Sequence, residues 1–239
     1  MLYGEFSPAV GMTDSVANFP RAIRSFVIRA GRTTGAQQRA LADLWPHFGI
    51  AFSDVVLDLG TLFGRSAPCT LEIGFGNGDH LAARAQAEPH RDFLGVEVHR
   101  PGIGHLLRAA AAAGLKNLRV IDHDAVEVLK WQIAPETLDE VQILFPDPWP
   151  KKRHHKRRLI QPEFAALVAT RLRANGRLLL ATDWAPYAEH MREVLSACSL
   201  LAPLPAPPVG MNERLQTRFE RRGLRLGHAV ADLGFQRRA

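Results

Sequence analysis

The stretch LEIGFGNGDH, residues 71–80, joins a predicted strand to a predicted helix through a glycine-rich turn. The apolar run CTLEIG (69–74) predicts the strand, and residues 79–88 predict the helix. The turn between them holds three glycines spaced G-x-G-x-G: Gly74, Gly76 and Gly78. Because glycine has no Cβ, the backbone can turn sharply there and a ligand can approach it closely. This order of elements predicts an α/β domain with a ligand site beside the turn.

The same alternation of strands and helices continues along the chain. Further strands are predicted at residues 92–98, 117–121, 140–145, 177–183 and 229–235. Further helices are predicted at residues 101–114, 124–131, 161–174 and 185–197, the third of them stopped by Asn175-Gly176. Strands separated by helices of this length form βαβ units, so we expect a mostly parallel sheet with helices on both faces. The proline-rich residues 202–210 predict a loop.

The composition indicates a folded chain with a basic surface. Of its 239 residues, 46% are hydrophobic and 23% charged, which allows a sizeable core. We expect residues 1–20 to be a flexible N-terminal arm and residues 21–239 to be a single domain. The formal net charge of +6 favours a polyanionic partner. Five arginines between positions 21 and 39 are either a solvated lead-in to the domain or an arm that contacts phosphates.

Cysteine usage and the lack of long apolar runs indicate the compartment. Cys69 and Cys198 are far apart in apolar surroundings, which is typical of buried thiols in a reducing environment. The first twenty residues lack the pattern of a signal peptide, and no apolar run approaches the ~20 residues of a membrane span. We therefore expect a cytoplasmic protein that uses no membrane and no metal.

The glycine turn itself indicates what kind of ligand it holds. A dinucleotide fingerprint, G-x-G-x-x-G, would place its third glycine at position 79, where this chain has Asp79. An acid, Glu72, stands two positions before the first glycine. A ligand without phosphate therefore fits this turn better than a dinucleotide does.

Acids also end the next two predicted strands. Glu97 lies about 20 residues beyond the glycines, where an acid accepts hydrogen bonds from ribose hydroxyls. Asp122 or Asp124 follows the next strand, within reach of an adenine edge. S-adenosylmethionine contains a ribose, an adenine, an ammonium and a sulfonium but no phosphate. It is therefore the predicted cofactor.

The stretch FPDPWPKKRHHKRR, residues 145–158, places one acid beside a dense cationic run. Pro146 and Pro148 restrict the backbone on both sides of Asp147, which could accept hydrogen bonds from guanine N1 and N2. Trp149 either stacks on a base or packs against the sheet. Six of the eight residues that follow Pro150 are Lys or Arg, which favours a phosphodiester partner over a merely solvated face.

A further acid, Asp183, ends the predicted strand 177–183. We expect it on the same rim as Asp147, and it could also cap the following helix.

Several stretches together resemble the bacterial single-chain tRNA (guanine-N7) methyltransferases. They are RSFVIRAGRTTGAQQRAL, LEIGFGNGDHL, FLGVEVHRPGI, NLRVIDHDAVEVL, ILFPDPWPKKRHHKRRLI, ATDWAPYAEHM and TRFERRGLRLGH. The resemblance implies a Rossmann-like class I methyltransferase fold with a mostly parallel seven-stranded sheet. It implies methylation of N7 of a tRNA guanine, the variable-loop guanine at position 46, by a monomer or homodimer.

The resemblance also implies roles for individual residues. The S-adenosylmethionine site falls on Glu72, Glu97, Asp124, Asp147 and the glycine loop, and the catalytic acid is Asp147. The implied substrate contacts are Lys151, Asp183, Thr217, Arg218, Phe219 and Glu220. The implied RNA contacts are Arg153, His154, His155, Lys156, Arg157 and Arg158. The segment from Gly49 to Ser66 is longer than is usual in the family, and Pro150 stands where the family often has His.

Two rival functions are open at this point. Methyltransferases acting on an exocyclic amine place an Asn/Asp-Pro-Pro-aromatic motif at the same strand end, whereas residues 147–150 read Asp-Pro-Trp-Pro. The second rival is a non-catalytic RNA-binding protein on a degenerate methyltransferase fold. The acids and glycines retained around the predicted cofactor site disfavour it.

Overall fold

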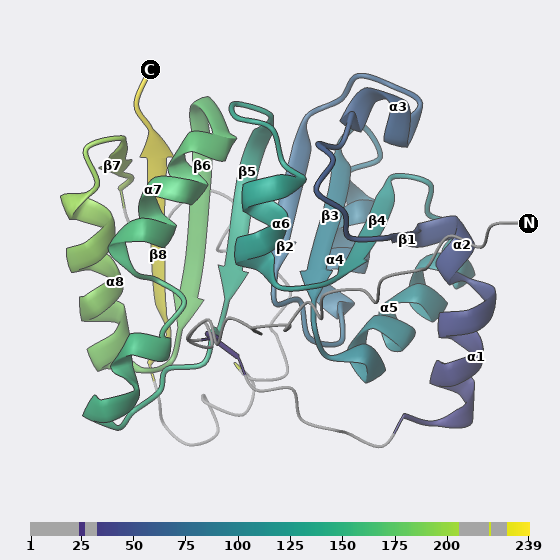
Figure 1. Cartoon of the computed structure of the whole chain (residues 1–239), viewed down its shortest axis with the longest axis horizontal. Coiled ribbons are helices and arrows are strands. Elements are labelled where there is room, and N and C mark those ends of the chain that lie inside the picture. The colour runs from purple at the N-terminus through teal and green to yellow at the C-terminus, as the bar shows by residue number, and fades with distance from the viewer. Residues whose placement is uncertain (1–23, 27–32, 206–219, 221–228) are drawn as a thin grey trace, which may run out of the picture.

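The computed structural model describes residues 24–26, 33–205, 220 and 229–239, so the predicted arm of residues 1–20 lies outside the described part. One mixed sheet with strand order β1-β4-β3-β2-β5-β6-β8-β7 organises the molecule (Figure 1). The strands are β1 Gly49–Ile50, β2 Cys69–Ile73, β3 Asp92–Glu97, β4 Leu118–Asp122, β5 Leu138–Leu144, β6 Leu172–Thr182, β7 Leu201–Pro203 and β8 Ala231–Arg237. Among the described strands, β8 runs opposite to the others and forms antiparallel pairs with β6 and β7, as expected for a mostly parallel sheet.

The expected number of seven strands was wrong, because the described sheet has eight. The additional strand, β1, forms one edge of the sheet and pairs in parallel with β4 through Gly49↔Val120 and Ile50↔Ile121. It comes from the segment that is longer than usual in the resembled family. Two residues are too few to produce a strand pattern in sequence.

Helices cover both faces of the sheet (Figure 1). They are α1 Gly35–Asp43, α2 Trp45–Phe48, α3 Leu59–Phe63, α4 Asp79–Ala87, α5 Arg100–Ala112, α6 Ala125–Trp131, α7 Pro162–Arg171 and α8 Ala185–Ala197, with a 3-10 helix η1 at Lys152–Arg157. Side chains alternate along each strand, so β3 sends Phe93 to the core beneath α4 and α5 and Leu94 to the core beneath α6, α7 and α8. None of the helices within the described ranges is long and apolar enough to cross a membrane.

Two predicted boundaries were wrong. The helix predicted at 161–174 ends at Arg171, and Asn175-Gly176 lies inside β6, where the pairing with β5 shifts register. Asn175 has a φ of +64°, so the turn signal marks an irregularity in a strand and not the end of a helix. The loop predicted at 202–210 begins inside β7, where Pro203 is tolerated because β7 is an edge strand.

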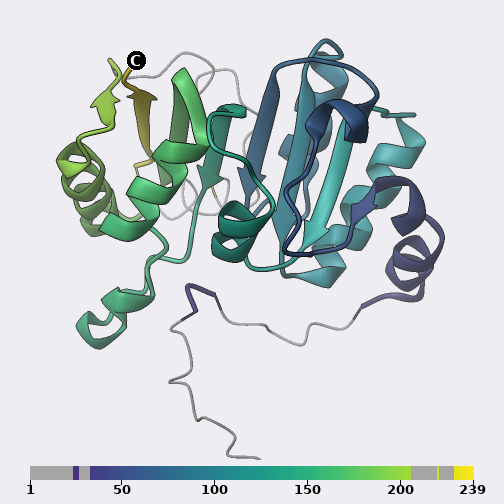
Figure 2. The ribbon, with the colours of Figure 1, turned by 45° about the horizontal axis from the view of Figure 1, so that its top comes forward.

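The topology brings the functional segments to one edge of the sheet. Strands β2, β3, β4 and β5 are mutually parallel, so their carboxyl ends lie side by side. Figure 2 shows the short described piece 24–26 below those strand ends. A ligand site at this edge can therefore draw on four strands at once.

Candidate active site

The glycine turn between β2 and α4 has the backbone shape that only glycine adopts without strain. Gly74, Gly76 and Gly78 all have positive φ, at +73°, +60° and +78°. The helix α5 packs directly on this loop, because a Cβ built on Gly102 would lie 1.9 Å from the carbonyl oxygen of Gly76. A Cβ on Gly74 or Gly76 would meet no atom within 4 Å in the described part of the chain. The loop is thus supported from α5 and open on its other side.

A cavity of about 400 Å³ lies on that open side, within the range usual for small-ligand sites. Its walls come from the glycine loop, the ends of β3, β4 and β5, and residues 25–26. The polar side chains that line it include Glu97, His99, His123 and Asp147, and none of its described lining residues is Lys or Arg. This donor and acceptor set fits a ligand without phosphate, as the sequence predicted for S-adenosylmethionine.

Glu97 is held rigidly at the end of β3. Its Oε2 accepts a hydrogen bond from the backbone N–H of Gly76 at 2.7 Å. Its Oε1 accepts from the N–H groups of Val98 at 2.7 Å and His99 at 3.0 Å. A carboxylate has about four lone-pair positions, so these contacts leave room for a ligand hydroxyl. Glu97 therefore couples the glycine loop to the cavity.

Glu72 lies on β2, two residues before Gly74, and is not among the described residues that line the cavity. Only 3% of its side chain is exposed, and its Oε2 is 3.0 Å from Nδ1 of His80 on α4. His80 was not singled out in the sequence, although its place two residues after Gly78 put it on the first turn of α4. The Nε2 of His80 is buried and has no hydrogen-bond partner among the described groups. The pair links the end of β2 to the first turn of α4, across the glycine loop that joins them.

The structure separates the two aspartates considered for the adenine edge. Asp122 ends β4 and pairs with Arg100, with 3.3 Å between Oδ2 and Nε, and burial raises the pKa of its carboxyl. Asp124 caps α6, because its Oδ1 accepts from the N–H of Val126 at 2.9 Å. His123, between them, lines the 400 Å³ cavity.

The segment that was longer than expected contacts the cavity wall through His123 without lining the cavity itself. Phe52 stacks on His123 with ring centroids 3.6 Å apart and an interplanar angle of 11°. Nε2 of His123 is 2.5 Å from Oε2 of Glu127. No sequence signal connected residues 52 and 123, which are brought together by the pairing of β1 with β4.

Asp147 lines the cavity from the loop after β5, and its side chain is exposed. Phe145 and Trp149, two residues before and after it, have φ of +54° and +43°, which bulky residues rarely adopt. Each such conformation costs on the order of 1–3 kcal/mol and persists only where the surroundings fix it. The sequence predicted stiffness from the prolines but not this backbone strain.

Trp149 packs within the protein. Its Nε1 donates to the carbonyl of Ser25 at 3.1 Å, and the guanidinium of Arg157 lies 4.1 Å from the ring centroid. The imidazole of His154 meets its ring edge-on at 5.8 Å. Of the two interpretations, packing is the one that these contacts favour.

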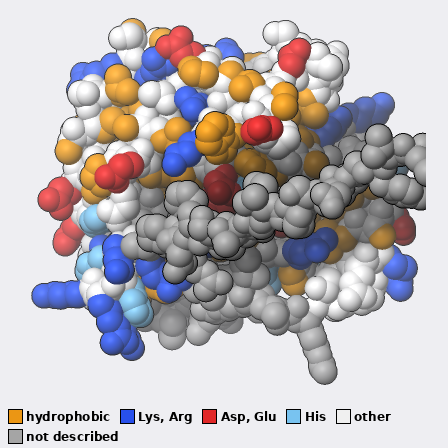
Figure 3. All heavy atoms as spheres, in the orientation of Figure 1, with side chains coloured by type: hydrophobic (Ala, Val, Ile, Leu, Met, Phe, Trp, Pro, Cys, Tyr) orange, Lys and Arg blue, Asp and Glu red, His pale blue; other side chains and the backbone are white. Residues whose placement is uncertain are grey.

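The cationic run forms the short helix η1, and the structure divides its members by exposure. Lys151, Lys152, Arg153 and Lys156 are exposed, whereas Arg157 is half-buried and Arg158 is buried, with 4% of its surface accessible. Figure 3 shows blue and pale-blue side chains of this kind gathered at the lower left of the molecule. The exposed members are available to a polyanion.

The two histidines of the run are half-buried. Desolvation, and then the positive charges of Arg153, Arg157, Lys151 and Lys156, lower the pKa of His154. These neighbours therefore disfavour a positive charge on the His154 imidazole.

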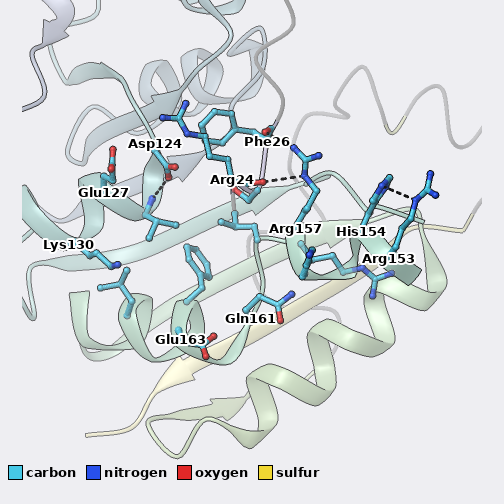
Figure 4. Close-up of a pocket in the computed structure, with 17 residues that line it drawn as sticks. Arg24, Phe26, Asp124, Glu127, Lys130, Arg153, His154, Arg157, Gln161 and Glu163 are labelled. Carbon is cyan, nitrogen blue, oxygen red and sulfur yellow. Dashed lines mark hydrogen bonds between the residues drawn. The ribbon is translucent and has the colours of Figure 1, made fainter. Parts of the chain in front are cut away.

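A second, larger hollow of about 1,090 Å³ adjoins η1. Figure 4 shows Asp124 and Glu127 at one end of it and Arg153, His154 and Arg157 at the other. The piece 24–26 lines both cavities, and its backbone carbonyls accept hydrogen bonds from Arg157. The cationic surface and the smaller cavity are therefore neighbours.

Of the remaining predicted substrate contacts, Asp183 and Glu220 lie in the described part of the chain. Asp183 follows β6 and is half-buried, but the N-cap residue of α8 is Trp184 and not Asp183. Glu220 is buried. Thr217, Arg218 and Phe219 lie outside the described residues. Within the described ranges, no three or more His, Cys, Asp or Glu side chains are grouped so as to hold a metal ion.

Comparisons with known proteins place this geometry in a family. Residues 66–233 match a protein-family model described as "Putative methyltransferase". The chain is 55% identical over 227 residues to the tRNA (guanine-N(7)-)-methyltransferase of Halorhodospira halophila, covering 92% of this chain and 96% of that protein. It is 52% identical over 216 residues to the enzyme of the same name from Leifsonia xyli subsp. xyli, covering 89% and 95%.

Solved structures confirm the predicted methyltransferase fold. The 16S rRNA methyltransferase KamB superposes with a TM-score of 0.54 at 18% identity, over 77% of this chain and 95% of that one. The antibiotic-resistance methyltransferase Kmr gives a TM-score of 0.54 at 14% identity, over 80% and 95%. These two likenesses concern the fold alone, and the sequence relatives carry the assignment. The chain belongs to the tRNA (guanine-N(7)-)-methyltransferase family.

Proposed function

We propose that this chain transfers a methyl group from S-adenosylmethionine to N7 of a guanine in tRNA. The observation that carries the proposal is the pairing of two neighbouring surfaces. One is a cavity lined by Glu97 and Asp147 without Lys or Arg among its described lining residues, and the other is the exposed cationic side of η1. The relatives named above support the same activity.

The cavity would hold S-adenosylmethionine, which supplies the methyl group as part of a sulfonium. Glu97 is suited to accept a hydrogen bond from the ribose, because three backbone N–H groups already fix its carboxylate. Gly74 and Gly76 carry no side chain, and no described atom lies within 4 Å of where their Cβ atoms would be, so a ligand can approach the loop closely. Glu72 and Asp124 are proposed cofactor residues from the family resemblance alone, because neither is among the described residues that line this cavity.

Asp147 would hold the guanine. N7 of guanine carries an in-plane lone pair, so no general base is needed, and the enzyme contributes chiefly alignment. A carboxylate at the cavity edge can accept hydrogen bonds from N1–H and N2–H of the base. It also stabilises the positive charge that develops on the ring. Asp147 therefore combines positioning with electrostatic stabilisation.

The other substrate contacts are proposed from the family resemblance. They are Lys151, Asp183, Thr217, Arg218, Phe219 and Glu220. Lys151 is exposed at the start of η1, next to the loop that carries Asp147. An ammonium in that place can hold a phosphate of the nucleotide that enters the site.

The exposed cations of η1 would bind the tRNA backbone, with Arg153 and Lys156 as proposed contacts. Contacts of this kind release counterions, so the affinity for tRNA should fall steeply with salt. We propose the variable-loop guanine at position 46 as the target. We also propose that the enzyme works in the cytoplasm as a monomer or homodimer.

A methylation assay tests the function against its rivals. Unmodified tRNA transcript is incubated with methyl-labelled S-adenosylmethionine, and the digested nucleosides are separated. The proposal predicts N7-methylguanosine and loss of the label when guanine 46 is changed to adenine. An N6-methyl or N4-methyl base would instead indicate an exocyclic-amine methyltransferase. Failure to bind S-adenosylmethionine in a titration would instead favour the non-catalytic RNA-binding protein.

A further inference from the structure

The last cation of the run, Arg158, is placed unlike its exposed neighbours. It is buried, with 4% of its surface accessible, whereas Arg153 and Lys156 are exposed. A phosphate cannot reach a guanidinium in that position without displacing protein. Its positive charge therefore interacts with groups inside the protein.

The contacts of Arg158 join the active-site loop to the domain core. Its Nε donates to the carbonyl oxygen of Pro148 at 3.0 Å, and its Nη2 is 3.2 Å from Nε2 of His155. Its Cζ lies 4.9 Å from the ring centroid of Tyr187. Tyr187 on α8 is fully buried, and its hydroxyl accepts from the N–H of Ile160 at 3.3 Å. Arg158 is thus fixed by its aromatic partner and by η1.

The loop held in this way is the one that carries Asp147. Pro148 follows Asp147 directly, and its carbonyl leads into Trp149, whose φ of +43° is unfavourable. A strained backbone persists only where surrounding contacts hold it in place. A hydrogen bond from a charged donor to a backbone carbonyl is a strong contact of this kind. Releasing that carbonyl would let the loop relax and move Asp147.

We propose that Arg158 is a positioning residue that holds the Pro148 carbonyl, and so fixes Asp147 at the edge of the cofactor cavity, and that it is not an RNA contact. The inference rests on the proposed function, because Asp147 is assigned to the guanine there. It also divides the six residues first expected to contact RNA into a surface group and an internal anchor. An arginine suits this place better than a lysine, because its planar guanidinium can donate to the carbonyl while lying over an aromatic ring.

Two matched variants separate positioning from RNA binding. Arg158→Lys keeps the charge but not the planar fork, and Arg153→Met removes an exposed cation of the same run. For Arg158→Lys we expect kcat to fall at least about tenfold, because small misplacements at a reacting centre are costly. We expect its KM for tRNA and the salt dependence of tRNA binding on filters to stay at the wild-type values.

For Arg153→Met we expect the opposite pattern. Its KM for tRNA should rise, its kcat should stay near wild type, and the slope of log affinity against log salt should become shallower by about one. An Arg158→Lys variant with wild-type kcat, or with a raised KM and a shallower slope, would overturn the proposal.

A measurement on the wild-type protein covers the case in which the Arg158 variant does not fold. Phenylglyoxal modifies accessible arginines, and peptide mass spectrometry locates the adducts. We expect modification of Arg153 that tRNA suppresses, and no modification of Arg158 with or without tRNA. Modification of Arg158 that tRNA suppresses would overturn the proposal. Wild-type protein that methylates no tRNA would contradict the proposed function instead, while the modification pattern would still show whether Arg158 meets RNA.

Discussion

Replacing Gly102 by alanine should weaken the binding of S-adenosylmethionine, because α5 packs directly on the glycine loop at this residue. The added Cβ would lie 1.9 Å from the carbonyl oxygen and 2.8 Å from the carbonyl carbon of Gly76. Real Cβ atoms keep at least about 3 Å from such atoms, so the loop or α5 must move by about 1 Å. The same loop residue donates the 2.7 Å hydrogen bond to Glu97.

The size of the effect follows from these two contacts. Overpacking of this kind costs about 1–3 kcal/mol. Weakening a hydrogen bond to a carboxylate costs up to about 1.5–3 kcal/mol. If about 2 kcal/mol of this cost applies only to the cofactor-bound state, the affinity for S-adenosylmethionine falls about 30-fold.

Isothermal titration of S-adenosylmethionine into the folded Gly102→Ala variant measures this loss. Gly114→Ala is the matched control, because Gly114 has a φ of +62° and an added Cβ there would meet no described atom within 4 Å. The control should lose about 1–2 kcal/mol of unfolding free energy from left-handed strain and bind the cofactor like wild type. A folded Gly102→Ala variant with wild-type affinity would refute the role assigned to the contact between α5 and the loop.

Three further outcomes are expected. Asp147→Ala should lower kcat by about 100-fold or more while tRNA retention on filters stays unchanged, because one oriented acid stabilises the developing charge. Lys152→Met combined with Lys156→Met should make the salt slope of tRNA binding shallower by about two, since each exposed cation neutralises one phosphate. Burial raises the pKa of Tyr187 to about 12 from 10.0, so the unfolded chain loses this proton first as pH rises. Stability should therefore fall by roughly 2–3 kcal/mol as the pH rises from the unfolded to the folded pKa, and chemical denaturation should show a smaller fall for Tyr187→Phe.

Each of these outcomes has a result that contradicts it. Wild-type turnover by Asp147→Ala would remove that acid from the mechanism. An unchanged salt slope in the double lysine variant would mean that η1 does not meet the RNA backbone. Equal loss of stability in wild type and Tyr187→Phe over the same alkaline range would show that other groups cause it.

The parts of the site that depend on local sequence could be predicted. The glycine turn, Glu97 at the end of β3 and Asp147 after β5 follow from strand and turn signals a few residues long. The parallel sheet then brings them together, because parallel strands end at one edge. The predicted order of strands and helices is therefore enough to gather these residues around one cavity.

The parts that depend on burial and long-range pairing could not be predicted. A run of cations does not show which member turns inward, so Arg158 was grouped with Arg153. The partner of Glu72 lies on α4 and is selected by packing, and the stacking of Phe52 on His123 requires the pairing of β1 with β4. The positive φ of Trp149 likewise has no signal in the residue type.

A crystal structure with S-adenosylhomocysteine would test the central claim most directly. We expect the ligand in the 400 Å³ cavity, with a ribose hydroxyl hydrogen-bonded to Glu97 and the sulfur facing the side on which Asp147 lies. A ligand bound elsewhere, or bound there without any contact to Glu97, would contradict the claim.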